Sequence, residues 1–432
     1  MTGSRDRVMG LEDAERLLLS LELFGMRFGL DRMRRLLTAL GSPQERFGAV
    51  HVVGTNGKSS TVRMTAAILR RHGLRVGAYL SPHLVTFAER VRVDDADVSG
   101  AEFAAAVQRA AGAAEKVDRR SDPDDRVTQF ELLTAAAFDL FARAGVDVAV
   151  VEAGLGGRFD ATNVLKSDVA VLTNVGLEHT RWLGPTVADI ATEKLDVLED
   201  GTTLVIGGDL HPDARALAEQ TARERHAELV VAPPDPGAGL EILARGAFQR
   251  RNFALAIEAA RAYLARAARP QRALDDEAVR AAAASTLVPG RFEVVAEPGG
   301  RAAVVLDGAH NPGGLTALAE ALPEFVGNRR LVACLAVLDD KDATEMLRTL
   351  LPLCSAVVTT RAPSPRALPP ATLASLCQQL GFGGPVEIVG EARAALERAR
   401  ELAGPDGVAL ATGSIYLIAD LLRPAGAARS TL

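Results

Sequence analysis

Residues Gly54 to Ser60 have the types and spacing of a loop that binds phosphate. A mostly apolar run at 49–53 precedes this loop and a helical pattern at 59–72 follows it, which is the context that phosphate-binding loops require. Glycines let backbone N–H groups approach phosphate oxygens, and the N-terminus of a helix attracts anions. Lys58 is placed to reach the β- and γ-phosphates of a nucleotide, and a hydroxyl can ligate Mg²⁺. The usual pattern has one further glycine, so this loop is a shortened variant.

A carboxylate, Glu152, lies near the end of the apolar run 146–154, two residues before Gly154. If the run is a strand of a parallel sheet, Glu152 projects from its carboxyl end, where ligands gather in α/β proteins. Carboxylate oxygens are ligands that Mg²⁺ prefers. The alternative is that Glu152 caps a helix or lies on the surface.

The elements that would position these residues alternate along the whole chain. Apolar runs of strand length fall at 49–53, 146–154, 167–176 and 202–208, and helical patterns include 188–199 and about 247–268. Runs that are apolar throughout suit strands covered on both faces. The pattern breaks at Pro289-Gly290 and restarts with runs at 302–308, 330–338, 355–360, 384–390 and 407–414. The sequence therefore predicts an α/β protein with a P-loop-type, mostly parallel sheet in residues 1–287 and a smaller Rossmann-like domain in residues 288–432.

Composition excludes several classes of protein. The 432 residues are 48% hydrophobic and 24% charged, which is typical of globular domains and not of disordered chains. The net charge is −6 and no run of basic residues occurs, so no nucleic-acid partner is expected. The three cysteines have no metal or redox spacing, and no membrane span or signal peptide is expected. We therefore expect a soluble, cytoplasmic protein.

Nine segments, in order along the chain, resemble those of the Mur ligase superfamily, and within it the folylpolyglutamate and dihydrofolate synthases. They are HVVGTNGKSST, SPHLVTFAERV, FELLTAAAF, VEAGLGGRFDATNVL, GLEHTRWLG, IATEKLDVL, PGRFE, LDGAHNP and DKD. The departures are small: Ser59 stands where glycine or threonine is commoner, Leu195-Asp196 replaces a usual Ala-Gly, and Val288 replaces a common tryptophan. None of them removes a reacting group.

The resemblance implies an ATP-dependent amide ligase that adds L-glutamate to dihydropteroate, to folylpoly-γ-glutamate, or to both. The γ-phosphate of ATP would pass to a substrate carboxylate, and the amine of glutamate would attack the acyl phosphate. Two Mg²⁺ ions would neutralise the anionic groups that meet in the site, and K⁺ is a further cation to consider. The implied partners are ATP, L-glutamate and dihydropteroate or reduced folates, and the chain is expected to be a monomer.

The same resemblance implies the metal ligands Ser60, Ser81, Glu152, His179 and Lys194, the last of them carbamylated. Ser60 and Ser81 would share one ion with Glu152, and His179 would contact the second. Imidazole is an unusual ligand for Mg²⁺, so the role of His179 depends on the matching GLEHT segment. For Lys194 the alternative is a surface cation paired with a nearby acid. Carbamylation would require surroundings that lower the pKa of the amine.

Nucleotide contacts outside the phosphate loop are implied for Asn252, Arg291 and Asp307. The amide of Asn252 can pair with a purine edge, and a guanidinium such as that of Arg291 suits phosphate. His310 is assigned to completing the active site. The expected ATP-binding residues are thus Gly54, Thr55, Asn56, Gly57, Lys58, Ser59, Ser60, Asn252, Arg291 and Asp307. The expected catalytic residues are Lys58, Glu152, His179, Lys194 and His310.

Three short segments fall where the family has its pterin-contacting loops. They contain Gly29, Leu30, Asp31, Arg32, Thr128, Gln129, Phe130, Glu131, Phe159, Asp160 and Ala161. Phe130 and Phe159 could stack on a flat heterocycle, with packing in the core as the equal alternative, and Asp160 could accept hydrogen bonds from pterin. The stretch 81–98 is expected to fold over this pocket.

Other functions stay open at this point. A UDP-muramoyl-peptide ligase would use the same chemistry, but the SPHL and GLGGRFDATN segments disfavour it. A P-loop GTPase or regulatory protein should carry an NKxD guanine-reading motif, which this sequence lacks. A catalytically silent binding module is disfavoured because every reactive position is filled.

Overall fold

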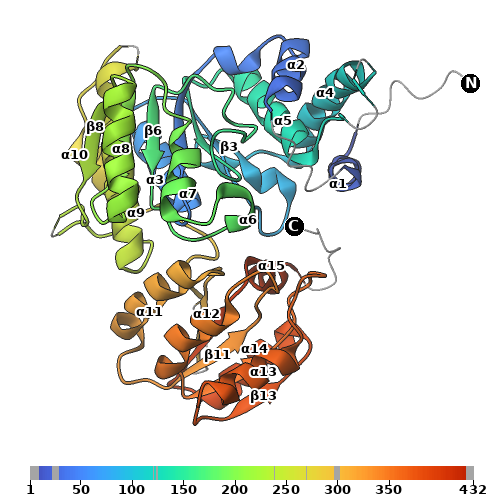
Figure 1. Ribbon diagram of the computed structural model, residues 1–432, viewed down its shortest axis with the longest axis vertical. Helices are drawn as coiled ribbons and strands as arrows, with labels where there is room; N and C mark the ends of the chain where they lie inside the picture. Colours follow the sequence, from blue (N-terminus) through green and yellow to red (C-terminus); the bar gives the residue numbers. More distant parts are fainter. Residues whose placement is uncertain are drawn as a thin grey trace, which may run out of the picture. The chain divides into compact units, whose positions relative to one another are not determined.

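The computed structural model describes residues 9–21, 29–119, 121–122, 125–237, 239–268, 270–295 and 302–424. The chain divides into two compact units, and Figure 1 labels many of their helices and some of their strands. Unit 1 contains Met1–Glu241 and Arg251–Thr286, and unit 2 contains Ile242–Arg250 and Leu287–Leu432. The division after residue 286 is one residue before the expected one, but the sequence did not predict that the segment 242–250 belongs to unit 2.

Unit 1 is built on an eight-stranded sheet with the strand order β4-β3-β2-β5-β1-β6-β7-β8. Its strands are β1 (Gly48–Val53), β2 (Val76–Tyr79), β3 (Val91–Val93), β4 (Ala96–Asp97), β5 (Val148–Glu152), β6 (Val169–Leu172), β7 (Thr203–Gly207) and β8 (Glu228–Ala232). Only the pairs β2–β3 and β3–β4 are antiparallel. Strands β5, β6 and β7 are buried along their whole length, which explains their continuous apolar runs. The predicted α/β class and the four predicted strands are confirmed.

The helices of unit 1 cover this sheet. They are α1 (Leu11–Ser20), α2 (Asp31–Ala39), α3 (Lys58–Arg71), α4 (Gly100–Asp118), α5 (Gln129–Ala144), α6 (Thr180–Leu183), α7 (Val187–Leu195), α8 (Pro212–Glu224) and α10 (Asp276–Ala283), with short 3₁₀ turns at η1 (Pro43–Glu45) and η2 (Phe87–Arg90). Helix α9 (Ala247–Arg266) starts in unit 2 and continues in unit 1. One core cluster joins α1, α2, α4 and α5 to the sheet, and another joins α7 and α8 to it. Helix α3 packs on β1, β2 and β5.

The stretch 81–98 is only partly a loop. Residues 87–90 form η2, and the following residues form the β3–β4 hairpin that extends the sheet from β2. Arg92 forms ion pairs with Asp95 and Asp97, so this hairpin is polar and lies at the edge of the sheet. Such a strand has no continuous apolar run, and the sequence therefore did not predict it.

Unit 2 is a smaller, six-stranded sheet with the order β13-β12-β11-β14-β10-β9, parallel except for the pair β9–β10. Its strands are β9 (Glu293–Val295), β10 (Ala303–Leu306), β11 (Leu331–Leu335), β12 (Ala356–Thr359), β13 (Val386–Ile388) and β14 (Val408–Thr412). Its helices are α11 (Pro312–Val326), α12 (Ala343–Leu350), α13 (Pro370–Gln379), α14 (Ala392–Ala403) and α15 (Ile415–Leu422), with the 3₁₀ turn η3 (Leu351–Leu353). The five runs predicted after residue 300 are all strands. Of the helices that the structure describes in either unit, none has the length and apolar character needed to cross a bilayer.

Candidate active site

Three neighbouring parallel strands, β5, β1 and β6, end at the same edge of the unit 1 sheet. Glu152 is the last residue of β5, the phosphate loop follows β1, and residues 173–179 follow β6. Because the strands run in parallel and β1 lies between the other two, their carboxyl ends bring these three segments together. This edge of the sheet is therefore the candidate site.

Two glycines of the phosphate loop are required by close packing. Gly54 has φ 149° and Gly57 has φ 85°, both in the region that favours glycine. A Cβ atom at Gly54 would lie 1.9 Å from Oγ1 of Thr173, and one at Gly57 would lie 2.4 Å from Oδ1 of Asn252. The amide of Asn252, the residue expected to contact adenine, thus lies directly against the phosphate loop.

The loop after β6 holds the phosphate loop through the backbone. The N–H of Thr55 donates to the Asn174 carbonyl (3.0 Å), and the N–H of Asn56 donates to Oδ1 of Asn174 (2.9 Å). Oγ1 of Thr173 donates to the Asn56 carbonyl (2.6 Å). These bonds fix the loop conformation. Sequence reasoning missed Thr173 and Asn174, which lie inside the predicted apolar run 167–176 but directly after the observed strand β6.

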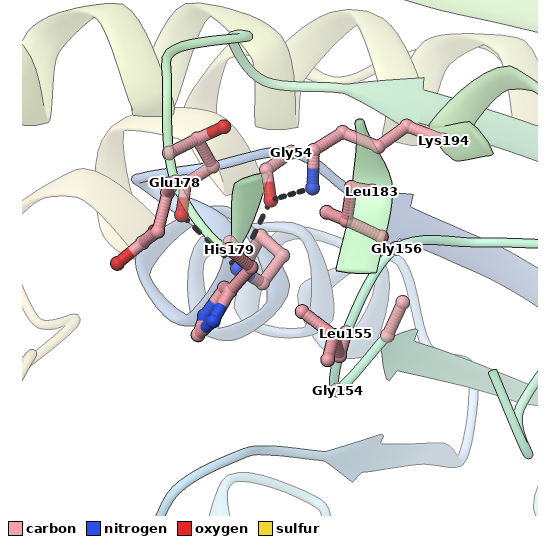
Figure 2. Close-up of a pocket in the computed structure, with 11 residues that line it drawn as sticks. Gly54, Gly154, Leu155, Gly156, Glu178, His179, Leu183 and Lys194 are labelled. Carbon is pink, nitrogen blue, oxygen red and sulfur yellow. Dashed lines mark hydrogen bonds between the residues drawn. The ribbon is translucent and has the colours of Figure 1, made fainter. Parts of the chain in front are cut away.

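Two lysine ammonium groups meet at one backbone carbonyl (Figure 2). Nζ of Lys58 donates to the carbonyls of Gly54 and Thr55, at 3.1 Å each, and Nζ of Lys194 donates to the Gly54 carbonyl at 2.9 Å. The side chain of Lys194 is buried, with a residue exposure of 4%. Burial, and secondly the charge of Lys58, lower the pKa of Lys194 to about 7. The alternative of a surface cation at Lys194 is therefore wrong.

A small cavity of about 20 Å³ lies beside these lysines. Its lining includes Lys58, Glu178, His179 and Lys194, with the glycine turn that follows β5 on the other side (Figure 2). This volume is enough for about one water molecule or ion. His179 has φ 53°, a left-handed conformation that is uncommon outside glycine and that concentrates at functional sites. Glu178 was missed by sequence reasoning, although it directly precedes His179 in the GLEHT segment.

Both oxygens of the Glu152 carboxylate are held by other segments. Oγ of Ser59 donates to Oε1 at 3.0 Å, and the N–H of Ser81 donates to Oε2 at 3.1 Å. The residue has an exposure of 2%, so Glu152 is neither a surface acid nor a helix cap. The hydroxyl beside Glu152 is that of Ser59. The residue expected from the sequence was Ser60 instead. Consecutive helical residues point about 100° apart, and Ser60 is buried in α3.

The residues after Ser81 fold back to hold it. The Glu89 carboxylate accepts hydrogen bonds from the N–H groups of residues 84, 85 and 86, at 2.8 to 3.0 Å. The Arg90 guanidinium donates to Nδ1 of His83 (2.9 Å) and weakly to Oγ of Ser81 (3.4 Å). Arg90 is buried, and its side chain also covers the ring of Phe87. Neither Glu89 nor Arg90 was identified from the sequence.

The first two expected pterin segments contact each other, and the second also packs on the turn after β5 that leads to the third. Nε of Arg32 in α2 is 3.2 Å from the carboxylate of Glu131 in α5, and the same guanidinium contacts Asp125 at 2.6 Å. A Cβ atom at Gly154 would lie 2.6 Å from Cζ of Phe130, so α5 also packs on the turn after β5. Gly29 has φ 126° and Leu30 is buried where α2 begins.

Most polar groups of these segments are used by the protein itself. Glu131 forms a capping box with Thr128 at the start of α5, and Gln129 donates to the carbonyl of Leu18 at 2.8 Å. The Asp160 carboxylate accepts from the N–H groups of Leu155 (2.7 Å) and Thr162 (3.0 Å).

Burial raises the pKa of the Asp160 carboxyl. The neighbouring Ala161 is also buried. This geometry supports a role for Asp160 in holding its turn, and its contact with pterin stays a prediction. Phe159, by contrast, is 42% exposed, and Asp31 is exposed too. The ring of Phe159 is thus partly exposed to solvent.

In unit 2, Asp307 and His310 follow β10, and Arg291 lies just before β9. The Asp307 carboxylate accepts from the N–H groups of Phe292 and Ala309, at 2.8 Å each, and burial raises its pKa. Nη1 of Arg291 donates to the Gly290 carbonyl (3.0 Å), and Nδ1 of His310 lies 2.8 Å from the Gly308 carbonyl. Asp307 therefore joins the PGRF turn to the DGAHNP loop.

Two family matches cover most of the chain. Residues 52–231 match the Mur ligase middle domain, and residues 290–415 match the Mur ligase glutamate ligase domain. A probable bifunctional folylpolyglutamate synthase/dihydropteroate synthase of Haloferax volcanii is 38% identical over 95% of this chain, which spans 50% of that protein's length. The dihydrofolate synthase/folylpolyglutamate synthase of Mycobacterium tuberculosis is 36% identical over 80% of this chain and 76% of its own.

Solved structures agree with these matches. The M. tuberculosis folylpolyglutamate synthase complexed with ADP superposes with a TM-score of 0.85 at 32% identity, covering 95% of this chain and 97% of that one. The Escherichia coli FolC in complex with DHPP and ADP superposes with a TM-score of 0.82 at 28% identity, covering 96% and 97% of the two chains. The chain therefore belongs to the folylpolyglutamate synthase/dihydrofolate synthase family, whose ATP-dependent ligases are built from Mur ligase domains.

Proposed function

We propose that this chain joins L-glutamate to the carboxylate of dihydropteroate, of a reduced folate, or of both, with cleavage of ATP to ADP and phosphate. One observation carries the proposal: the phosphate loop, Glu152 and the pocket with His179 and Lys194 meet at the ends of three adjacent strands. The similar E. coli protein was solved with DHPP and ADP, which supports a pterin and a nucleotide as ligands here.

In the proposed reaction, a carboxylate oxygen of the folate substrate attacks the γ-phosphorus of ATP, which forms an acyl phosphate and releases ADP. The amine of glutamate then attacks the acyl carbon, and the tetrahedral intermediate expels phosphate to leave an amide. Lys58 contributes charge to the first step. Its Nζ exchanges the Gly54 and Thr55 carbonyls for phosphate oxygens, because all of these acceptors lie at the same loop.

The oxygen donors at Glu152 fit Mg²⁺. Glu152, the Ser59 hydroxyl and Ser81 are hard oxygen ligands on three different segments, and Mg²⁺ is usually held by one or two carboxylates together with phosphates and waters. When bound there, Mg²⁺ would neutralise the charge of the phosphates and of the attacking carboxylate. In the described part of the chain, no group of three or more His, Cys, Asp or Glu side chains is placed to hold a metal.

The surroundings of Lys194 suit carbamylation. A neutral amine reacts with CO₂, and burial lowers the pKa of Lys194 to about 7, so a large fraction of the amine is neutral near neutral pH. The product is a carbamate with two oxygen ligands in the pocket that His179 also lines. We propose that these two residues serve the second Mg²⁺ site.

The pterin and the nucleotide are assigned to Phe159, Asn252 and three residues of unit 2. Phe159 is exposed on the turn after β5, so it is available to stack on the pterin ring. In unit 2, Asp307 and Arg291 are proposed to bind the nucleotide. His310 is proposed to complete the active site. Asn252 favours adenine, so ATP should be used far better than GTP.

The test is glutamate-dependent ADP release, measured side by side with dihydropteroate, with a reduced folate and with a UDP-muramoyl peptide. We expect release with at least one of the first two and none with the third, and kcat/KM for GTP at least tenfold below that for ATP. Glutamate-dependent release with the UDP-muramoyl peptide alone would overturn the proposed substrate class. Equal kcat/KM for the two nucleotides would overturn the role of Asn252.

A further inference from the structure

The turn after β5 lies directly on the backbone at Lys194. A Cβ atom at Gly157 would lie 2.5 Å from the carbonyl oxygen of Glu193 and 3.0 Å from Cα of Lys194, so the glycine permits this close approach. The N–H of Arg158 donates to the same Glu193 carbonyl at 2.9 Å. Carbonyls in the last turn of a helix have no partner within it, and this bond satisfies one of them near the end of α7. The turn and the end of α7 therefore fix each other's position.

The side chain of Arg158 adds two contacts to the same helix end. Its Nε is 3.5 Å from Oε1 of Glu193 and 3.5 Å from Oδ2 of Asp196. Nε is buried and has no hydrogen-bond partner among the described residues, so both contacts are ion pairs without a hydrogen bond. Glu193 and Asp196 are three residues apart, a spacing at which like charges on a helix repel each other. The guanidinium offsets this repulsion and holds the helix end to the turn.

Asp196 lies where this segment departs from the family that it resembles, since Leu195-Asp196 replaces a usual Ala-Gly. Leu195 is buried in the core cluster that joins α7 and α8 to the sheet. Asp196 is the C-cap of α7 and is also 4.0 Å from Nη2 of Arg225. A glycine at position 196 would remove one of the two carboxylates that contact Arg158. The pair Arg158–Asp196 is therefore a feature of this chain and not of the family pattern.

The turn and α7 both line the cavity beside the phosphate loop. Figure 2 shows Leu155 and Gly156 of the turn near it, together with Lys194, whose Nζ lies 2.9 Å from the Gly54 carbonyl. Lys58 lines the same cavity, and its positive charge would favour an anionic carbamate at Lys194. A shift of the turn against α7 would move the amine away from this charge.

We propose that Arg158 and Asp196 position Lys194, because their ion pair fixes the turn after β5 against the end of α7. Neither side chain touches substrate or metal in this proposal, so both are positioning residues. The inference rests on the proposed function, since it takes Lys194 to be the carbamylated lysine. Breaking the pair should raise the bicarbonate concentration needed to carbamylate Lys194 and should lower kcat, while the KM for ATP changes little.

The experiment compares the full-length wild type with Arg158→Gln, Asp196→Asn and the double variant. Arg215→Gln is the matched control, because Arg215 forms an ion pair of similar exposure with Glu219 within α8. The carbamate is followed by ¹³C NMR as ¹³C-bicarbonate is added in the presence of Mg²⁺ and ADP, and Lys194→Ala gives the background signal. Steady-state kinetics below saturating bicarbonate give kcat and the KM for ATP, and thermal unfolding establishes that each variant is folded.

The side chains of Arg158 and Asp196 are 39% and 34% exposed, so solvent partly screens their ion pair and the expected effects are a few-fold. We expect the half-saturating bicarbonate concentration to rise about fivefold in Arg158→Gln, which loses both ion pairs, and about threefold in Asp196→Asn. The value of kcat should fall by the same factors. The double variant should resemble Arg158→Gln, because the pair is already broken there, and the control should resemble the wild type.

An unchanged bicarbonate requirement in Arg158→Gln would overturn the proposal. A rise of about fifteenfold in the double variant, as expected for two independent residues, or an equal rise in the control would also overturn it. If the wild type itself shows no carbamate signal, the carbamate of the proposed function fails instead, and kcat then decides the positioning role. The two failures are therefore distinguishable.

Discussion

The phosphate side and the expected pterin side of unit 1 differ in what their polar groups do. On the phosphate side, Lys58 and Lys194 are held by backbone carbonyls of the phosphate loop and line one small cavity. On the pterin side, Arg32, Glu131 and Asp160 form hydrogen bonds with other protein groups. The first arrangement keeps charged groups available for ligands, and the second uses charged groups to fix loops.

This difference predicts which substitutions impair chemistry and which impair folding. A group that is held only by backbone carbonyls, such as Lys58, can be removed without leaving a buried charge unpaired. A group in a buried ion pair cannot, because its partner is left without compensation. Variants on the two sides should therefore separate activity from stability.

The largest effect is expected for Lys58→Ala. Loss of the charge at the phosphates should lower kcat/KM for ligation at least about a thousandfold, or ~4 kcal/mol, with little change in the melting temperature. Steady-state kinetics and thermal unfolding measure the two quantities. Activity within about tenfold of the wild type would disprove the assignment of the phosphate loop.

Lys194→Ala should lower activity about a hundredfold, or ~3 kcal/mol, because the two oxygen ligands of the proposed carbamate would be lost from the pocket. A small carboxylic acid in the assay should restore part of this activity, whereas Lys194→Arg should be as inactive as the alanine variant. Arginine keeps a positive charge and does not form the carbamate. Wild-type activity in Lys194→Arg would rule out the carbamate.

Arg32→Ala should affect stability first. It leaves the carboxylate of Glu131 buried without its cation, and the free energy of unfolding should fall by about 3 kcal/mol. Denaturant unfolding measures this change, and the double variant Arg32→Leu/Glu131→Gln should recover part of it. Unchanged stability together with a raised KM for the pterin would show instead that Arg32 contacts substrate.

Acid should weaken the contact between His51 of β1, the strand before the phosphate loop, and Thr162, which follows the expected pterin segment 159–161. This residue of β1 is fully buried, its Nε2 lies 2.8 Å from Oγ1 of Thr162, and burial lowers its pKa to about 4. The unfolded chain therefore takes up the proton first as the pH falls below about 6.5, and stability is lost from there down to about pH 4.

Between pH 7 and pH 5 the wild type should lose about 2 kcal/mol more of its free energy of unfolding than His51→Gln does. Urea unfolding of both proteins at the two pH values gives this difference. Parallel losses in the two proteins would mean that the ring of His51 does not titrate in this range.

The smallest effect is expected for Phe159→Leu. The ring is 42% exposed, so its replacement should leave stability within about 0.5 kcal/mol. Loss of stacking should raise the KM for the pterin several-fold, or ~1 kcal/mol, without changing nucleotide binding. If the free energy of unfolding fell by more than the free-energy equivalent of the KM change, Phe159 would have a structural role like that of Arg32 and Glu131.

The sequence predicted most of the central strands of both sheets, because buried parallel strands leave continuous apolar runs. It did not predict β2 and β9, which are only four and three residues long, or the β3–β4 hairpin, which carries charged residues. Edge strand β8 was also missed, although residues 229–232 form a short apolar run. For the hydroxyl near Glu152 it named Ser60, whereas Ser59 contacts the carboxylate, because the rotation of α3 decides which of two adjacent serines faces it. Glu89 could have been found from the Thr86-x-x-Glu89 spacing of a capping box, whereas no such rule points to Arg90, whose partners lie within its own loop.

The resting position of Lys58 has a consequence for selectivity among anions. Its ammonium group already has two carbonyl partners, at Gly54 and Thr55. A polyphosphate chain offers several anionic oxygens along the loop that can replace both carbonyls, whereas chloride offers a single contact. We therefore expect the loop to prefer a polyphosphate to a small anion such as chloride.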